Sequence, residues 1–512
     1  MPARKKAKQA AAKKTTRRPA KKTTKKAAKT RATTAAGGIG QAPAGFLLVN
    51  MIPQSLSGET NQDSEPHLTV NPANPKMIIG TAFSPNPGGG ALGPVYKSLD
   101  EGATWTVNAI VPSQAGSLIG TGDITTSFNR TGTKLYGGIL RAGTGALTFL
   151  RTNVPAFPPM TILNPPGRPS ADQPFTHATT VASGAGAGQD RVYIGDNDFA
   201  APGGKTQTID ESLNAAVGPP TPFSSVRVEK RTTVGQDGPQ CRPVAHPNGT
   251  VYGAFYGWRA LTGSFPANTL VITSADVVVV RDDNWGAGGF VNLKEPPPPA
   301  GDGLAGVRVV RGISFPFMRN GNAATGQQRI GGTISIAVNP NNSKDVFLAW
   351  GASATGSFLT IHVRRSTNAG ATWSNDLLVI PKATNAALAI NSAGVVGILY
   401  QQVVGTGVAQ RWVTHLQRSG NGGVTWTDLV LATVPATTPV KTFDPYIGDY
   451  DHLVAVGAKF YGIFSANNTP NLANFPNGVV YRRNANFATH TLLNVNNVSP
   501  VAPSIDPFFF KV

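Results

Sequence analysis

Short runs in which apolar and polar residues alternate recur along most of the chain, separated by stretches rich in Gly, Pro, Asn and Asp. Residues 95–97 and 361–364 are examples, and each run leads into a turn that contains glycine. Alternation with a period of two is typical of half-buried β-strands, and clustered Gly, Asn and Asp favour hairpin turns. The pattern therefore predicts an all-β protein made of many short strands.

One turn sequence occurs three times, each time between two predicted strands. It reads SLDEGATW at 98–105, STNAGATW at 366–373 and SGNGGVTW at 419–426. Asp or Asn can cap such a turn, Gly allows a positive φ, and Trp can anchor the returning strand in the core. The residues predicted to hold these three box turns are Ser98, Asp100, Gly102, Trp105, Ser366, Asn368, Gly370, Trp373, Ser419, Asn421, Gly423 and Trp426.

Strand–turn–strand units begin at seven places, most of them roughly 50–60 residues apart. The starts lie near Glu65, Asp123, Asp172, Asp237, Gly332, Asn385 and Asp449. Each start can be paired with a second hairpin, which gives a four-stranded sheet per unit, and seven such sheets correspond to a seven-bladed β-propeller. Six blades would require residues 385–434 or 121–163 to be only a connection. Residues 295–330, which include four consecutive prolines, are predicted to be an insertion.

The box turns resemble the Asp-box (bacterial neuraminidase, BNR) repeat of sialidases and related proteins, over roughly residues 61–512. This resemblance implies a β-propeller with four-stranded antiparallel blades, in which the boxes are structural and lie opposite the active site. It also implies action on glycans, as a glycoside hydrolase of the exo-sialidase type. The same repeat occurs in non-catalytic propellers, so a binding module is the alternative.

Composition changes this picture mainly through charge. The net charge is +19, but residues 1–36 contain 14 Lys and Arg and no acid, which leaves 31 basic and 26 acidic residues elsewhere, a net charge of +5. With no Leu, Ile, Val or Phe, this segment is predicted to be a disordered tail, and it resembles the Lys/Ala/Thr-rich tails of linker histones. Residues 4–31 are expected to bind nucleic acid or another polyanion, or else to act as a solubilising or targeting extension. Residues 37–60 are expected to form a flexible joint and a lead-in strand.

Several other classes of protein are disfavoured. No apolar run is long enough for a transmembrane helix, and no apolar core follows the basic segment as in a standard secretory signal. We therefore expect the protein in the cytoplasm, unless a non-standard route exports it. The sequence does not give the oligomeric state, and a monomer is the expectation. Cys241 is the single cysteine, and the seven histidines lack zinc-ligand spacing. No metal or cofactor is expected, with Ca²⁺ at Asp196-Asn197-Asp198 as the alternative.

Propeller geometry predicts which residues face the working end, because the first strand of each blade starts there and the second returns to it. Acidic, aromatic and arginine side chains at those positions are typical of a saccharide site. The catalytic candidates are Glu65, Asp172, Asp449 and Tyr450. The candidates for substrate binding are Asp123, Asp196, Asp237, Arg242, Trp258, Arg259 and Arg329.

The resemblance to sialidases is incomplete at the first strand of the propeller. Sialidases carry an Arg-Ile-Pro element there, whereas this chain has Glu65-Pro66-His67. Three arginines grip the substrate carboxylate in sialidases, and here they would have to be Arg242, Arg259 and Arg329. A glycan hydrolase and a non-catalytic propeller tethered by its basic tail therefore remain the two hypotheses.

Overall fold

The computed structural model describes residues 44–84, 92–112, 120–141, 146–201, 203–264, 267, 269–317, 332–353, 358–439 and 447–512. The predicted basic tail lies outside these residues. Regular structure within them is almost entirely β-strand, as predicted. The exceptions are three single 3₁₀ turns, η1 (Gln54–Leu56), η2 (Gly407–Ala409) and η3 (Leu472–Asn474). No helix in this part of the chain is long and apolar enough to cross a membrane.

The strands form seven main sheets, the first four of which follow one another along the chain. The first contains β2 (His67–Val70), β3 (Ile78–Thr81), β4 (Leu92–Ser98) and β5 (Thr106–Pro112). The second contains β6 (Ile124–Phe128), β7 (Lys134–Arg141), β8 (Ala146–Asn153) and β10 (Arg168–Pro169), with β9 (Thr161–Ile162) paired to β8. The third contains β11 (Ala171–Thr180), β12 (Asp190–Asp198), β13 (Thr206–Ser212) and β14 (Ser224–Arg227). The fourth contains β15 (Arg242–Ala245), β16 (Val251–Thr262), β17 (Val271–Asp282) and β18 (Val307–Pro316).

The remaining sheets complete the series. The fifth contains β19 (Ile334–Asn339), β20 (Asn342–Ala352), β21 (Thr360–Ser366) and β22 (Leu378–Pro381). The sixth contains β23 (Ala383–Ile390), β24 (Val396–Val404), β25 (Arg411–Ser419) and β26 (Thr427–Pro435). The seventh contains β27 (His452–Val456), β28 (Lys459–Asn467), β33 (Ile505–Lys511) and β1 (Leu47–Asn50), with β29 (Val480–Tyr481) beside β1. A small sheet of β30 (Ala485–Asn486), β31 (Thr491–Leu493) and β32 (Pro500–Val501) is inserted between β28 and β33.

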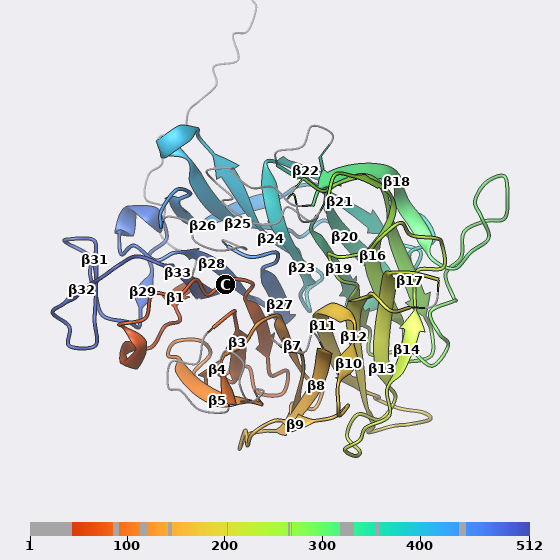
Figure 1. Ribbon diagram of the computed structural model, residues 1–512, viewed down its shortest axis with the longest axis horizontal. Coiled ribbons are helices and arrows are strands. Elements are labelled where there is room, and N and C mark those ends of the chain that lie inside the picture. The colour runs from red at the N-terminus through yellow and green to blue at the C-terminus, as the bar shows by residue number, and fades with distance from the viewer. Residues whose placement is uncertain are drawn as a thin grey trace, which may run out of the picture. The chain divides into compact units, whose positions relative to one another are not determined.

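The seven sheets close into a ring through their first strands. β2 packs beside β6, β6 beside β11, β11 beside β15, and so on through β19, β23 and β27, which returns to β2. Figure 1 shows the sheets following one another around a common centre, from orange through green to blue. The predicted β-propeller is therefore confirmed, with seven four-stranded blades rather than six.

The ring is closed by a strand from each end of the described chain. β1 pairs in antiparallel register with β33, so that Leu48 lies opposite Phe510 and Val49 opposite Phe509. The side chains of Leu48 and Val49 are buried in the cores on either side of the seventh sheet. The expected lead-in strand is thus the fourth strand of the last blade, and it belongs to the propeller.

The predicted insertion at 295–330 is wrong in part. Residues 307–316 form β18, which pairs with β17 and completes the fourth sheet, with Val310 opposite Val277. Among the described residues of that segment, those before 307 belong to the loop that connects β17 and β18. The run of four prolines removes backbone donors and interrupts the alternating pattern, which hid the strand that follows it.

The three box turns share one set of hydrogen bonds. In the first, Ser98 Oγ donates to Asp100 Oδ1 (2.8 Å) and accepts from the Gly102 N–H (2.9 Å), while Trp105 Nε1 donates to the Gly102 carbonyl (3.0 Å). The other two turns repeat these bonds with Asn in place of Asp. Each turn joins the third and fourth strands of an antiparallel sheet. The box turns therefore lie at the end of the ring where the first strands finish.

Candidate functional site

Hydrogen bonds between neighbouring first strands identify the residues that lie at one level of the central channel. The Thr126 N–H donates to His67 Nδ1 (3.3 Å), and the Thr176 N–H donates to Thr125 Oγ1 (2.8 Å). Equivalent bonds link β11 to β15, β27 to β2 and β19 to β23. They place His452, His67, Thr125, Phe175 and Arg242 at one level, and they place Thr333 level with Asn385.

Four side chains of this level meet on the axis and form what we call the axial layer: His67, Phe175, Arg242 and His452. The imidazoles of His67 and His452 are stacked with centroids 3.9 Å apart, and the guanidinium of Arg242 lies 4.0 Å from the centre of the Phe175 ring. The ring centroid of Phe175, in the third sheet, lies 5.6 Å from the ring centroid of His452, in the seventh. Because these sheets are not neighbours in the ring, the axial layer crosses the centre and closes the channel there.

A channel of about 460 Å³ extends from the axial layer towards the box-turn end, lined by the first strands. The two stacked histidines at its closed end are neutral. Burial lowers the pKa of His67, with His452 and Arg242 adding to the effect, and burial lowers the pKa of His452 to about 3. Arg242 is therefore the charged member of the axial layer.

Carboxylates lie on the other side of the axial layer, where the first strands start. The positions two residues before the layer in four blades are Glu65, Asp123, Gln173 and Tyr450, and all four side chains are buried. Glu65 and Gln173 have φ values of 51° and 55°, which is a strained conformation for a residue with a side chain. Such strain is commonly found at functional sites.

A hydrogen bond across the axis adds Asp449 to this group. Gln173 Nε2 in the third blade donates to Asp449 Oδ2 (3.1 Å), which directly precedes the seventh blade. The structure therefore brings together Glu65, Asp123, Arg242, Asp449 and Tyr450, and we call these five residues the axial cluster.

Tyr450 is a neutral phenol in this setting. Burial raises its pKa well above the ordinary value, and the neighbouring carboxylates of Glu65 and Asp123 raise it further, with Arg242 acting in the opposite direction. Its hydroxyl has no hydrogen-bond partner among the described residues. Tyr450 can therefore donate a hydrogen bond to a ligand, and it can act as a nucleophile only if a base takes its proton in the same step.

Arg242 stays charged although it is buried. Burial lowers its pKa to about 10, and the nearby Tyr450, Asp449 and Glu65 limit the fall. Its Nε has no hydrogen-bond partner within the described part of the chain. The guanidinium lies 5.2 Å from the Tyr450 ring centre, so a cation, a phenol and carboxylates share one site on the axis.

Two other predicted acids have structural partners. Asp172 Oδ1 accepts a hydrogen bond from the N–H of Gln173 (2.8 Å), so it supports the residue that binds Asp449. Asp196 forms an ion pair with Arg168 (2.7 Å), and burial followed by repulsion from Asp210 raises its pKa. The cation that Asp196 binds is thus Arg168. Among the described residues no group of three or more His, Cys, Asp or Glu side chains is placed to hold a metal ion.

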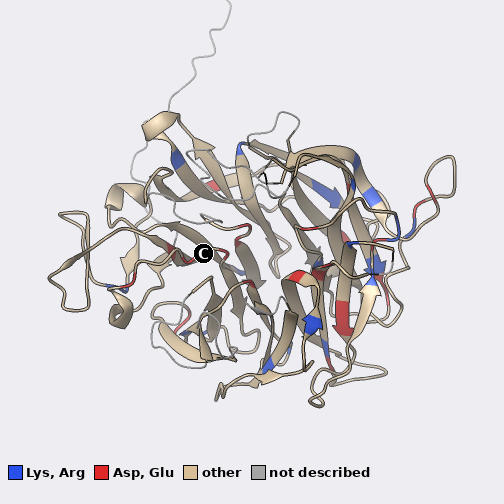
Figure 2. Ribbon diagram, viewed as in Figure 1, with Lys and Arg blue, Asp and Glu red and all other residues tan. Residues whose placement is uncertain are grey.

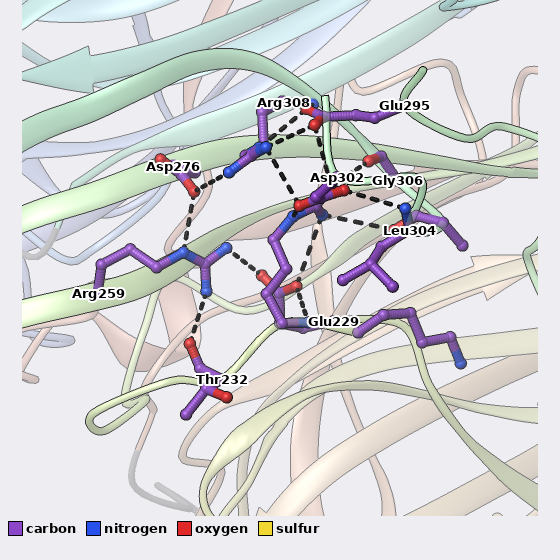
Figure 3. A network of polar contacts seen from close by, with 12 residues as sticks. Glu229, Thr232, Arg259, Asp276, Glu295, Asp302, Leu304, Gly306 and Arg308 are labelled. Atoms are coloured by element: carbon purple, nitrogen blue, oxygen red, sulfur yellow. Dashed lines mark hydrogen bonds and ion pairs between the residues drawn. The ribbon is translucent and has the colours of Figure 1, made fainter. Parts of the chain in front are cut away.

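Arg259 is held in an ion-pair network on the fourth blade rather than in the axial cluster. Its Nη2 lies 2.8 Å from Glu229 Oε2 and its Nε 2.9 Å from Asp276 Oδ2. Figure 3 shows the network continuing through Arg308 to Glu295 and Asp302. Basic and acidic segments lie close together in this part of the ring (Figure 2). Arg259 therefore has its carboxylate partners already, and Arg329 lies outside the described residues.

Asp237 and Trp258 line a separate pocket beside the fourth blade. The catalytic and substrate-binding candidates chosen from the sequence did not include Phe175, His67 or His452. A repeated X-Pro-aromatic pattern, Glu65-Pro66-His67 and Gln173-Pro174-Phe175, was the available signal for the axial layer. Nothing local pointed to Arg168 as the partner of Asp196.

No family model and no curated protein sequence matches the chain, but solved structures do. A sialidase of Trypanosoma rangeli in complex with the inhibitor DANA aligns at 12% identity and a TM-score of 0.35, over 92% of this chain and 60% of the sialidase. An alpha-L-arabinanase of Penicillium chrysogenum complexed with arabinobiose aligns at 12% identity and a TM-score of 0.39, over 90% and 97% of the two chains. An alpha-L-arabinofuranosidase of Fusarium graminearum aligns at 10% identity and a TM-score of 0.40, over 91% and 98%. At these values none of the alignments assigns a function to the chain.

Proposed function

We propose that the axial cluster binds a glycan and hydrolyses a glycosidic bond. One observation carries this proposal: three carboxylates surround a buried arginine and an unpartnered phenol on the propeller axis, at the end opposite the box turns. Outside the tail the chain carries similar numbers of basic and acidic residues. Three carboxylates gathered at one buried place therefore indicate a chemical role rather than an acidic composition. Paired carboxylates are what glycoside hydrolysis requires.

The side chains of the axial cluster suit the steps of that reaction. One of Glu65, Asp123 and Asp449 would protonate the leaving oxygen, and another would act as the base or nucleophile. The transition state has the character of an oxocarbenium ion, and fixed negative groups in a water-poor site stabilise its positive charge. The hydroxyl of Tyr450 and the guanidinium of Arg242 would donate hydrogen bonds that orient the sugar.

The arginine set bears on the choice of substrate. A sialoside would need several cations around its carboxylate, and the described residues place only Arg242 in the axial cluster. Arg259 is engaged by Glu229 and Asp276. We therefore favour an uncharged glycan and keep exo-sialidase activity as the other arm of the test.

An activity panel tests this proposal. The full-length protein is expected to hydrolyse at least one member of a panel of neutral oligosaccharides and sialosides, and Tyr450→Phe is expected to lower kcat roughly 10- to 100-fold because one oriented donor is lost. Asp172→Ala is expected to lower kcat less than Tyr450→Phe does, since the Asp172 carboxylate acts on the site through the backbone of Gln173. Absence of turnover on every substrate, or turnover unaffected by Tyr450→Phe, would contradict the proposal.

The charge distribution favours a second function of the protein, carried by the basic tail. We propose that residues 4–31 tether the protein to nucleic acid or another polyanion, whether or not the propeller is catalytic. Deletion of residues 1–36 is expected to abolish binding to duplex DNA, together with the steep loss of affinity that added salt produces. Fluorescence anisotropy at several salt concentrations measures both. Equal binding by the shortened chain would place the DNA contact elsewhere.

A further inference from the structure

A second pocket of about 680 Å³ opens beside the fourth blade. Its wall includes the end of β16, the loop before β15 and the loop between β12 and β13, all at the end of the ring where the first strands start. Trp258, Leu261 and Leu270 give it an apolar floor, while Lys205 and Asp237 place one charge of each sign on its wall.

Two buried donors in this pocket lack partners. Nε1 of Trp258 and Nε2 of Gln236 have no hydrogen-bond partner among the described residues, and the two side chains are 2% and 0% exposed. The Gln236 side chain is held in place because its Oε1 accepts a hydrogen bond from the backbone N–H of Trp258 (3.4 Å). A buried N–H without an acceptor is unfavourable, so an acceptor supplied by a ligand would be favoured there.

The pocket adjoins the axial cluster through a short piece of backbone. Asp237 lines the pocket, and the next residue, Gly238, has φ 107° and packs against the side chain of Gln173. The positive φ of Gly238 favours glycine, and a Cβ there would lie 2.9 Å from Gln173 Oε1, so a larger residue would also displace the Gln173 side chain. Gln173 in turn binds Asp449. A ligand on the axial cluster that extends towards the fourth blade would therefore meet this pocket next.

From this arrangement we infer that the pocket is a subsite for a second, uncharged sugar unit of the glycan held at the axial cluster. A pyranose or furanose ring has an apolar face that can lie on Trp258 and Leu261, and its oxygens can accept from the N–H groups of Trp258 and Gln236. Opposite charges at Lys205 and Asp237 favour neither an anionic nor a cationic ligand. This inference rests on the proposed glycan function.

The test compares glycans of one and of several sugar units in direct binding and in hydrolysis. Trp258→Phe keeps an aromatic ring on the floor but removes the indole N–H. It is expected to weaken binding of neutral oligosaccharides roughly 3- to 10-fold and to leave single-unit ligands unchanged. Trp426→Phe, which removes an indole N–H from a box turn at the opposite end, is the matched control. It should change neither the affinity for neutral oligosaccharides nor the affinity for single-unit ligands.

Lys205→Met separates a neutral ligand from an anionic one. It is expected to change oligosaccharide affinity by less than about twofold, because the ligand is uncharged and the lysine is exposed. A large loss would show an anionic ligand and overturn the assignment. Equal affinities of the wild-type protein and Trp258→Phe for every chain length would also overturn it. If oligosaccharides bind in a manner that depends on Trp258 but are never cleaved, the subsite stands and the proposed hydrolysis fails.

Discussion

Replacement of Glu65 by glutamine is expected to lower kcat on the best glycan substrate roughly 10²- to 10⁴-fold, the range for loss of a catalytic acid or base. Glu65 is 1% exposed, and after burial it makes the largest contribution to the raised pKa of Tyr450. Glutamine has the same shape but can neither donate a carboxyl proton nor carry negative charge. Steady-state kinetics on the wild-type protein and the variant, with thermal unfolding measured in parallel, give the result.

A matched control distinguishes catalysis from general damage. Asp196→Asn is also an acid-to-amide change at a buried position, but Asp196 pairs with Arg168 rather than facing Tyr450. It is expected to lower the unfolding temperature and to leave kcat nearly unchanged. Comparable losses of kcat in the two variants would remove Glu65 from the catalytic site.

Deletion of residues 1–52 is expected to prevent stable folding, whereas deletion of residues 1–43 should leave the unfolding temperature unchanged. The longer deletion removes Leu48, Val49, Met51 and Ile52, which are 0–2% exposed. Burial of four such side chains contributes about 6–12 kcal/mol, similar to the roughly 5–15 kcal/mol that stabilises a whole domain. It also leaves the edge of β33 unpaired, which favours aggregation.

The measurement is scanning fluorimetry of the two shortened chains, supported by size-exclusion chromatography. Addition of a synthetic peptide covering residues 44–52 should restore a folded, monomeric species to the longer deletion, because the peptide can pair with β33. A folded and equally stable protein without residues 1–52 would show that β1 does not close the ring in solution.

Local sequence patterns predicted the blades well because each blade is a local structure. The box turns depend on contacts within eight residues, so Ser98, Asp100 and Trp105 were sufficient to identify one. Blade starts were predicted within a few residues for the same reason, since Pro, Gly and Asp mark them. The pairing of β1 with β33 left no such signal, because Asn50 and Asp506, which share a hydrogen bond, are 456 residues apart.

The candidate site was predictable only as far as ring geometry determines it. Glu65, Asp123, Asp449 and Tyr450 come together because equivalent positions of a propeller face one axis. Asp196 and Arg259 were selected by the same rule, but the partner of Asp196 is Arg168 on β10 of the preceding blade, and that of Arg259 is Glu229 on the connection between the third and fourth blades. Whether a buried charge faces a ligand or a neighbouring side chain depends on packing between blades, which single-sequence patterns do not report.

The closure of the ring also has a consequence for biosynthesis. At about 5–20 residues per second, a ribosome needs roughly 20–90 s to travel from β1 to β33. Throughout that time Leu48 and Val49 remain an apolar strand without the neighbour that finally covers it. The last blade therefore cannot be completed before β33 has been synthesised, and a chaperone that covers β1 until then would protect its apolar side chains.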